Sequence, residues 1–582
     1  MVSNVALVAI VAIVALVFCG PALPAIAQNV PASPSPSSSA TPEPGASPAP
    51  TVSSAPPATL RLTRSAVSIS PGQSAAIGVG GASGTVTVQS SSSSIGARYD
   101  TASSSVVVSG STLGNATVTV TDAAGNIATI AVDVLPAAGV VPSDVTVSLG
   151  GLVSPQFALA KVEGAIARLA AMQAGGRAVL SGVTIANPLR PGDELEAIAH
   201  VAITAGSAFA DQLGATAVHL RVETLDQLEP AFLFYSDDPE RLGPDGDGVL
   251  YRNTIDVDRP ARVYAYHVSD TPGRRLYLAL VASGASARVQ VLGYAAGPAD
   301  AFAYVGHVST LQYLLERSTQ ESAIVDVAEN APYLQQLGYR ALGPGELVAA
   351  IFDLRVLDGG PVSVEVVSAS GDGDPLQLLS EAEHSGDGHG RRGEFALATV
   401  PPLALAYAAG APEPAPLAIG DPTIPNLRPG GRALGGDYGV LRDVALQLAN
   451  PASAPANVYL FEQALGGTAT TTIWFGGDPL PTEIPCLRLS ESRYVVKTFA
   501  LGAGESRTVT GEYMTDGSSS FPLDFGLTTT PPSPPPGPYS PDACNPKTPP
   551  ATPSPSPSPS PSSNPAGSPP PQAPSAAPSA SP

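Results

Sequence analysis

Basic residues are scarce in this sequence. Its 582 residues include 28 Lys and Arg against 49 Asp and Glu, which gives a formal net charge of −21. A nucleic-acid-binding surface needs a basic stripe that displaces counterions from phosphates, and docking on anionic lipid needs a similar cluster. Neither is visible, so the composition argues against nucleic acid and against anionic lipid headgroups as partners.

Aromatic residues and enzyme motifs are also sparse. Aromatics make up 5% of the chain and there is one Trp, whereas sugar-stacking platforms usually need more rings. No G-x-S-x-G nucleophile elbow is present, and no Walker or dinucleotide-binding glycine loop lies at a strand–helix junction. We therefore predict a protein that is not an enzyme and needs no cofactor, with Ca²⁺ as the alternative discussed below.

Only one long hydrophobic run is present. It covers Val5–Phe18 and is followed by an A-x-A site ending at Ala27, although no basic residue precedes it. The run is shorter than the ~20 residues of a spanning helix, so residues 1–27 are predicted to be a signal peptide. A lipid anchor on Cys19 is the alternative, but Phe18 fills a position that such cleavage keeps small. We expect export to the periplasm, cell surface or extracellular space, without a transmembrane segment in the mature chain.

Cysteines are few: after the signal peptide only Cys486 and Cys544 remain. A pair in an exported protein predicts a disulfide bond. Two unpaired thiols are the alternative, because Cys544 lies in a segment predicted to be disordered.

Proline and serine, in contrast, are abundant at both ends. Residues 28–57 and 531–582 are Pro/Ser/Ala-rich, a composition that favours extended, solvated chain and buries no core. We predict a flexible linker and a disordered tail around the folded part.

Residues 58–136 contain eight short apolar-alternating runs separated by turn residues, which predicts a small antiparallel sandwich. Their last segment, STLGNATVTVTDAAGNIATIAVDV (111–134), resembles the end of a bacterial Ig-like (BIG-type) domain. The resemblance implies an Ig-like β-sandwich and, since such domains serve as spacers, adhesin repeats and docking modules, no particular activity.

The remaining blocks also follow the strand period. Residues 144–410 are predicted as a β-rich middle region of one or two domains, and residues 411–530 as a C-terminal β-sandwich. An amphipathic helix is expected at Ser154–Ala174, capped by Ser154. Shorter helical patches are predicted at Leu311–Glu316 and Pro332–Gln336. The fold class is thus mainly β, with multi-domain antiparallel β-sandwiches.

The strongest candidate for a metal or catalytic site is Tyr235–Tyr251, a stretch between two apolar runs. It contains five acids: Asp237, Asp238, Glu240, Asp245 and Asp247. An EF-hand register fails from either Asp237 or Asp245, because oxygen ligands are missing at the required positions. An irregular Ca²⁺ site is one hypothesis. A solvated turn is the other, and it is favoured because Gly-Asp-Gly recurs at 371–373 and 386–388.

Two of these acids could also form a glycosidase pair. Such carboxylates lie ~5–10 Å apart near sugar-stacking rings, and Tyr235, Tyr251, Tyr264 and Tyr266 are nearby in the sequence. Catalytic acids usually lie at the ends of separate strands, however. The clustering of these acids in one connection therefore argues against a glycosidase pair.

A second candidate is Glu381–Glu394. His384, Asp387 and His389 could bind a transition metal such as Zn²⁺ or Cu²⁺. The glycine-rich spacing lacks the geometry of a helical pair, and Arg391 and Arg392 would repel a cation, so a solvated loop is favoured. The scattered histidines, among them His267 and His307, are expected to be hydrogen-bonded structural residues unless the fold brings them together with carboxylates.

These observations predict an exported, non-enzymatic β-sandwich protein of the cell envelope or extracellular space, used for adhesion, scaffolding or binding of an envelope or extracellular component. One alternative is a carbohydrate- or Ca²⁺-binding module. The other is an envelope polysaccharide hydrolase that uses an acidic or His-containing loop of the middle region.

Overall fold

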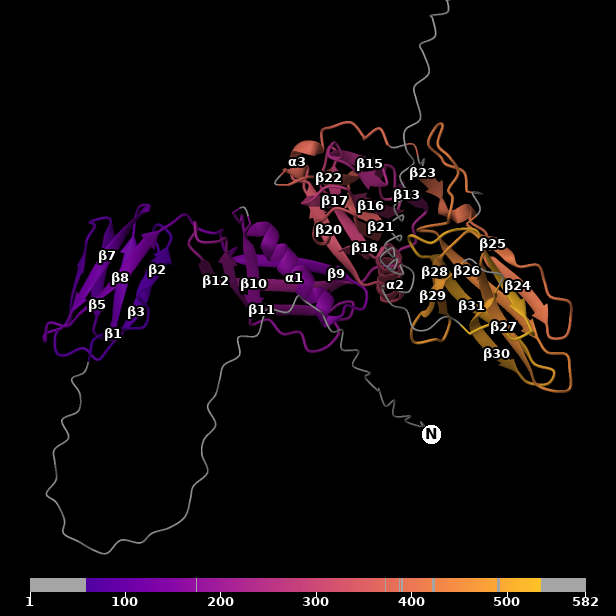
Figure 1. The fold of residues 1–582 in the computed structure, drawn as a ribbon, viewed down its shortest axis with the longest axis horizontal. Coiled ribbons are helices and arrows are strands. Elements are labelled where there is room, and N and C mark those ends of the chain that lie inside the picture. Colours follow the sequence, from indigo (N-terminus) through magenta and orange to yellow (C-terminus); the bar gives the residue numbers. More distant parts are fainter. Residues whose placement is uncertain are drawn as a thin grey trace, which may run out of the picture. The chain divides into compact units, whose positions relative to one another are not determined.

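The computed structural model describes residues 59–534, except 174, 372, 387, 389–390, 421–423 and 489–491. The predicted signal peptide (1–27), the linker (28–57), Cys19, Cys544 and nearly all of the predicted tail (531–582) lie outside the described residues. Within them the mainly β fold class is confirmed: strands dominate, helices are few, and most strand pairs are antiparallel (Figure 1).

Residues 61–134 form a sandwich of two four-stranded sheets, ordered β1-β3-β6-β5 and β2-β8-β7-β4. Alternate residues such as Val118, Val120, Ile130 and Val132 are fully buried between them, as period-2 patterning requires. The eight strands are β1 (Arg61–Leu62), β2 (Ala66–Ile69), β3 (Ser74–Gly80), β4 (Thr87–Ser90), β5 (Ile95–Asp100), β6 (Ser105–Gly110), β7 (Gly114–Thr121) and β8 (Ile127–Val134).

One eleven-stranded sheet runs through residues 144–396 in the order β10-β11-β12-β9-β19-β18-β21-β16-β13-β23, with β14 paired to β16. Its strands are β9 (Asp144–Gly150), β10 (Arg177–Ser181), β11 (Glu194–Thr204), β12 (Gln212–Glu223), β13 (Phe232–Ser236), β14 (Arg241–Leu242), β16 (Ala261–Ser269), β18 (Ala287–Ala299), β19 (Ser322–Val327), β21 (Glu346–Gly359) and β23 (Arg392–Ala396).

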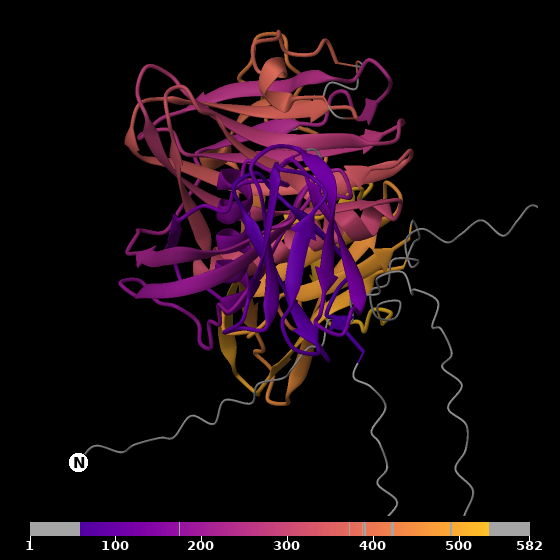
Figure 2. The ribbon, with the colours of Figure 1, turned by 90° about the vertical axis from the view of Figure 1, so that its left-hand side faces the viewer.

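A smaller sheet, ordered β15-β22-β17-β20, packs on the central strands of this large sheet. Apolar residues of β16, β18 and β21 meet those of the smaller sheet in one core, and these strands, magenta to orange, can be followed in Figure 2. The four strands are β15 (Gly248–Ile255), β17 (Arg274–Ala282), β20 (Tyr333–Leu342) and β22 (Val362–Ala369).

The helices agree only in part with the sequence prediction. Helix α1 (Pro155–Leu169) begins where expected, with the Ser154 side chain accepting from the Phe157 N–H, and ends five residues before the predicted limit. The patch at 311–316 belongs to a longer helix, α2 (Phe302–Thr319). The helical prediction for Pro332–Gln336 is wrong, because Tyr333–Gln336 begin strand β20 and pair with β17. A short helix, α3 (Pro375–Leu378), and the 3₁₀-helix η1 (Leu397–Thr399) are the remaining helices of the described residues.

The C-terminal sandwich starts earlier than position 411, since β24 already pairs with β26. Its sheets are ordered β24-β26-β31-β28-β29 and β25-β32-β27-β30. They consist of β24 (Leu403–Ala408), β25 (Leu417–Ile419), β26 (Leu441–Ala449), β27 (Ala456–Ala464), β28 (Ala469–Phe475), β29 (Thr482–Leu487), β30 (Tyr494–Leu501), β31 (Ser506–Thr515) and β32 (Leu523–Thr528).

A buried ion pair connects the middle region with the segment that precedes β26. On β16, the Arg262 Nε and Nη2 donate to Asp353 of β21 at 2.7 and 3.1 Å, and the Nη1 donates to the Gly439 carbonyl at 3.0 Å. Tyr313 of α2 donates to the same carboxylate at 2.7 Å. Since a buried charge is tolerated only with such partners, this network fixes the position of Tyr438 beside β16.

No helix of the described segments is long and apolar enough to cross a membrane.

Candidate functional site

A polar cavity of about 270 Å³ lies where the middle region meets the C-terminal sandwich. We call it the tyrosine pocket. It collects residues from the start of the acidic stretch, from β16, from the residue before β23 and from the loop after β31. Its lining is Tyr235, Asp237, Glu240, Tyr264, Tyr266, Phe302, Arg391, Tyr438, Ser518, Ser519 and Ser520.

Neighbouring strands bring the tyrosines together. Tyr235 and Tyr264 are direct partners in the parallel pair β13–β16, and their rings stack at 5.1 Å between centroids with an interplanar angle of 11°. The Tyr438 ring lies 6.2 Å from that of Tyr264. Tyr266, two residues along the same strand face, bonds with the Ser518 hydroxyl at 2.5 Å. The phenol groups are thus held rigidly around the cavity.

Asp237 is the buried acid of the tyrosine pocket. It follows directly after β13, and the residue is only 2% exposed. Its Oδ2 accepts a long hydrogen bond from Tyr235 at 3.4 Å and lies 3.5 Å from Arg391. Its Oδ1 is buried and has no hydrogen-bond partner among the described residues. Burial raises the pKa of this carboxyl well above its ordinary range, and Arg391 opposes the shift only in part.

Glu240 and Arg391 complete the charged wall. The Arg391 guanidinium lies 3.6 Å from Glu240 and keeps 44% of its side-chain surface exposed. The Asp237 N–H donates to the Arg391 carbonyl at 3.0 Å, so the backbone holds the acid and the base side by side. From the sequence, Arg391 is expected only to repel metal ions. In the structure its guanidinium lies beside two acids of the acidic stretch, Asp237 and Glu240.

The structure does not gather the five acids of that stretch around one point. Asp237 and Glu240 line the tyrosine pocket, whereas Asp247 receives hydrogen bonds from Arg274 and Ser370, each at 2.6 Å. Asp245 is exposed. In the part of the chain that the structure covers, no three His, Cys, Asp or Glu residues are placed to hold a metal ion.

The prediction of a solvated turn is wrong for the first residues of the acidic stretch. Asp237 and Asp238 are 2% and 6% exposed, respectively. The reason is that the chain stays against the sheet after β13: the Asp237 backbone pairs with Arg391, and the Pro239 carbonyl accepts from His267 at 2.8 Å. Only the later part of the connection, around Asp245, faces solvent.

The second predicted metal site cannot be assembled from the described residues, because Asp387 and His389 lie outside them. His384 is described: its backbone N–H donates to the Val249 carbonyl at 2.7 Å. The neighbouring Glu383 pairs with Arg428 at 2.8 Å. The described part of this loop is therefore held by backbone and ion-pair contacts.

Two buried histidines have different surroundings. His267 bonds through one nitrogen to the Ser236 hydroxyl at 2.9 Å, which is the spacing of a nucleophile and its base. Both residues are 0% exposed, so no substrate reaches the hydroxyl. We interpret this pair as structural.

His307 contacts two carboxylates, one on each ring nitrogen: Asp516 at 2.7 Å and Glu483 at 2.8 Å. Burial lowers its pKa, but the charge of Asp516 and the hydrogen bonds outweigh burial and raise it to about 9. Asp516 also accepts from Thr472 at 3.0 Å. The sequence left open that histidines meet carboxylates, but could not identify partners so far apart along the chain. The cluster ties α2 to the C-terminal sandwich.

Cys486 on β29 is buried and disulfide-bonded. Cys544 lies outside the described residues, so the Cys486–Cys544 pairing stays a prediction.

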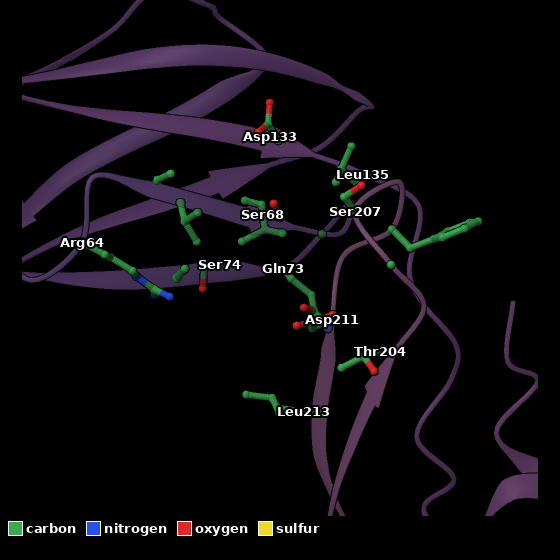
Figure 3. A pocket seen from close by; sticks show the side chains of 17 residues that line it. Arg64, Ser68, Gln73, Ser74, Asp133, Leu135, Thr204, Ser207, Asp211 and Leu213 are labelled. Carbon is green, nitrogen blue, oxygen red and sulfur yellow. The ribbon is translucent and has the colours of Figure 1, made fainter. Parts of the chain in front are cut away.

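A larger, open groove of about 1470 Å³ lies between β2, β3 and the loop before β12 (Figure 3). Gln73 extends toward the loop that carries Asp211 and donates to Gln212 at 2.7 Å. Gln212 in turn donates to Ser70 and to the Ala210 carbonyl. The buried Gln212 and Ser70 thus have hydrogen-bond partners within the protein.

Comparison with known proteins gives no family for this chain: no protein-family model matches, and no curated protein sequence is similar. Among solved structures, tripeptidyl peptidase 2 aligns over 82% of this chain and 34% of its own, at 8% identity and a TM-score of 0.13. This chain thus spans about a third of that protein.

Two further solved structures concern carbohydrate binding. The Bacteroides ovatus mixed-linkage glucan utilization locus SGBP-B aligns over 54% of this chain and 74% of its own, at 14% identity and a TM-score of 0.12. An N-terminal CBM22 tandem domain from Paenibacillus barcinonensis aligns over 61% and 94%, at 11% identity and a TM-score of 0.11. Because the TM-scores are this low, these likenesses carry no argument about function.

Proposed function

We propose that the protein is a non-enzymatic binding protein, exported to the cell envelope or extracellular space, that holds a small polyhydroxylated ligand such as one saccharide unit in the tyrosine pocket. The observation that carries this proposal is the buried Asp237 oxygen, which has no partner among the described residues, in a cavity whose lining also includes four tyrosines and three serines. A buried acceptor without a partner costs about 1–3 kcal/mol, and a ligand hydroxyl that donates to it removes that cost.

The chemistry of the pocket wall suits such a ligand. Asp237 and Glu240 offer acceptors to sugar hydroxyls, and Arg391 and Ser518 offer donors. Its volume of about 270 Å³ lies just below the usual range for ligand pockets, which starts at ~300 Å³, and this favours a single sugar ring over a long chain segment. Rigid tyrosines keep these groups in place before the ligand arrives, which reduces the entropy cost of binding.

A polysaccharide hydrolase is the second candidate, because one observation favours it. A general acid needs a raised pKa, and burial raises the pKa of Asp237 well above its ordinary range beside a second acid, Glu240. Binding is favoured over hydrolysis because the cavity is small and Asp237 already contacts Tyr235 and Arg391.

The test is a glycan-array screen of the mature chain, followed by titration of each hit and an assay for newly formed reducing ends. We expect saturable binding without turnover. The Arg391→Met variant should weaken binding at least tenfold, since it removes the donor next to both acids. Turnover that disappears in an Asp237→Asn variant would establish the hydrolase instead. A lack of any glycan binding would overturn the proposal.

We also propose export to the periplasm, cell surface or extracellular space, on the sequence features of residues 1–27. The sequence features of 111–134 support an Ig-like nature of residues 58–136. In this account the N-terminal sandwich acts as a spacer for the ligand-binding part.

A further inference from the structure

A second cavity, of about 470 Å³, lies under helix α1. We call it the α1 cavity. Its walls are one face of α1 and the beginning of β20, which is the edge strand of the smaller sheet. Strands β9 and β19 of the large sheet form its floor. Figure 1 shows α1 lying over the sheet that contains β9 and β10.

Small residues of α1 leave this space open. Ala160, Gly164 and Ala165 line the α1 cavity. A glycine inside a helix costs ~1 kcal/mol relative to alanine, yet a Cβ at Gly164 would meet only the Arg168 Nη1, at an ordinary contact distance of 3.7 Å. Backbone crowding therefore does not require the glycine. Its effect is to widen the cavity.

Two basic side chains face this cavity without an acidic partner. Lys161 and Arg168 are seven residues apart, which places them on one face of α1, two turns from each other. Within the described part of the chain neither has an ion pair within 4.0 Å. The Arg168 guanidinium instead covers the Tyr333 ring at 5.1 Å, and Lys161 Nζ lies 4.6 Å from the Phe157 ring.

The acids nearest to Lys161 are occupied elsewhere. Glu316 accepts from the Gly293 N–H at 3.1 Å, and Glu321 accepts from the Ser154 N–H at 2.5 Å. Burial raises the pKa of Glu316 to about 8, despite the nearby Lys161. Burial likewise lowers the pKa of Lys161, and the charges of Glu316 and Glu321 oppose that shift. Among the described residues neither acid forms an ion pair with Lys161 within 4.0 Å.

Two polar residues on the cavity wall also have known partners. Asp326 is the one acid on the lining and lies 3.5 Å from Arg288. The Gln335 side-chain Oε1 accepts from the Tyr333 hydroxyl at 3.4 Å, which leaves the side-chain amide N–H groups as donors at the cavity wall. The α1 cavity thus presents two basic side chains and an amide donor to whatever enters it.

We propose that the α1 cavity binds a small organic anion of about monosaccharide size, such as a sugar acid, whose carboxylate is held by Lys161 and Arg168. The volume fits one ring, and charge-assisted hydrogen bonds to a carboxylate are the strongest that these side chains can form. This site is separate from the tyrosine pocket and shares no lining residue with it.

The experiment titrates the mature chain with D-glucuronate, and with D-glucose as the uncharged counterpart, at constant ionic strength set with NaCl. We expect saturable glucuronate binding that sulfate competes away, and at least tenfold weaker binding of glucose. Lys161→Met and Arg168→Met should each raise the Kd for glucuronate at least tenfold. Arg61→Met, which removes an exposed arginine of the N-terminal sandwich, should leave it unchanged.

A pair of substitutions at Gly164 separates cavity loss from misfolding. Gly164→Ala should fold and bind within threefold of the parent protein, whereas Gly164→Leu should fill the cavity and abolish binding. Circular dichroism checks that both fold. The proposal is overturned if glucuronate does not bind above the NaCl control, or if it binds equally well to the Lys161→Met/Arg168→Met double variant. Loss of binding in Asp237→Asn with no change in Lys161→Met would assign the ligand to the tyrosine pocket and overturn it as well.

Discussion

The two ends of the connection between β13 and β15 carry the same kind of residue in different surroundings. At one end Asp247 is matched by Arg274 and Ser370, each at 2.6 Å. At the other end Asp237 is almost completely buried, and one of its oxygens has no partner among the described residues. An acid with complete partners stabilises the fold. An acid with a buried oxygen that has no partner costs stability, and we propose that a ligand hydroxyl removes this cost.

The largest effect is expected at the matched end. Asp247→Ala leaves the fully buried Arg274 guanidinium without its carboxylate. Breaking a buried pair costs about 3–5 kcal/mol. Because the Asp247 side chain is 35% exposed, we expect about 3 kcal/mol or slightly less. Urea unfolding measures the change. A loss below about 0.5 kcal/mol would show that this acid is no better matched than Asp237.

The His307 cluster extends the comparison to a second matched acid, Asp516. The folded pKa of His307 is raised to about 9 from an ordinary value of 6.5, so its contribution is complete below about pH 6.5 and is lost as pH rises through about 9. Between pH 7 and pH 10 the parent protein should lose about 2 kcal/mol more than His307→Gln. Urea unfolding at both pH values checks this, and equal losses in the two proteins would contradict it.

Asp237→Asn is expected to behave in the opposite way. The folded pKa of Asp237 is raised above the ordinary 3.8, so the acid stabilises the fold while protonated and destabilises it increasingly as pH rises. The variant should match the parent at pH 4 and exceed it by about 1 kcal/mol at pH 8, because a neutral amide has no buried charge. Denaturation at both pH values tests the sign. A variant that is less stable at pH 8 would mean that Asp237 is matched after all.

The smallest effect is expected at Asp245, which lies in the same connection but is exposed. Asp245→Asn should change the free energy of unfolding by less than about 0.5 kcal/mol at any pH between 5 and 8. The same unfolding assay measures it. A larger change would show that exposure does not separate the two ends of the connection.

Local patterns predicted the strands that frame the tyrosine pocket. The apolar runs around the acidic stretch became β13 and β15, and Ser154 caps α1 as expected. These predictions succeed because strand alternation and helix capping depend on residues only a few positions apart.

The pocket itself could not be predicted, because its parts come from distant segments. Tyr235 and Tyr264 meet through a parallel strand pairing, while Tyr438 and Ser518 come from the C-terminal sandwich. No local periodicity records such contacts. The helix predicted for Pro332–Gln336 is wrong for the same reason. Pairing with β17 decides the conformation of Tyr333–Gln336, and local periodicity does not record this pairing.

We propose that the buried, unpartnered oxygen of Asp237 recognises a ligand hydroxyl. The most direct measurement is calorimetric titration of the best glycan from the array into the parent protein, Asp237→Asn and Asp245→Asn. We expect Asp237→Asn to raise the Kd at least tenfold and Asp245→Asn to keep a Kd within twofold of that of the parent. Equal affinities for all three proteins would contradict it.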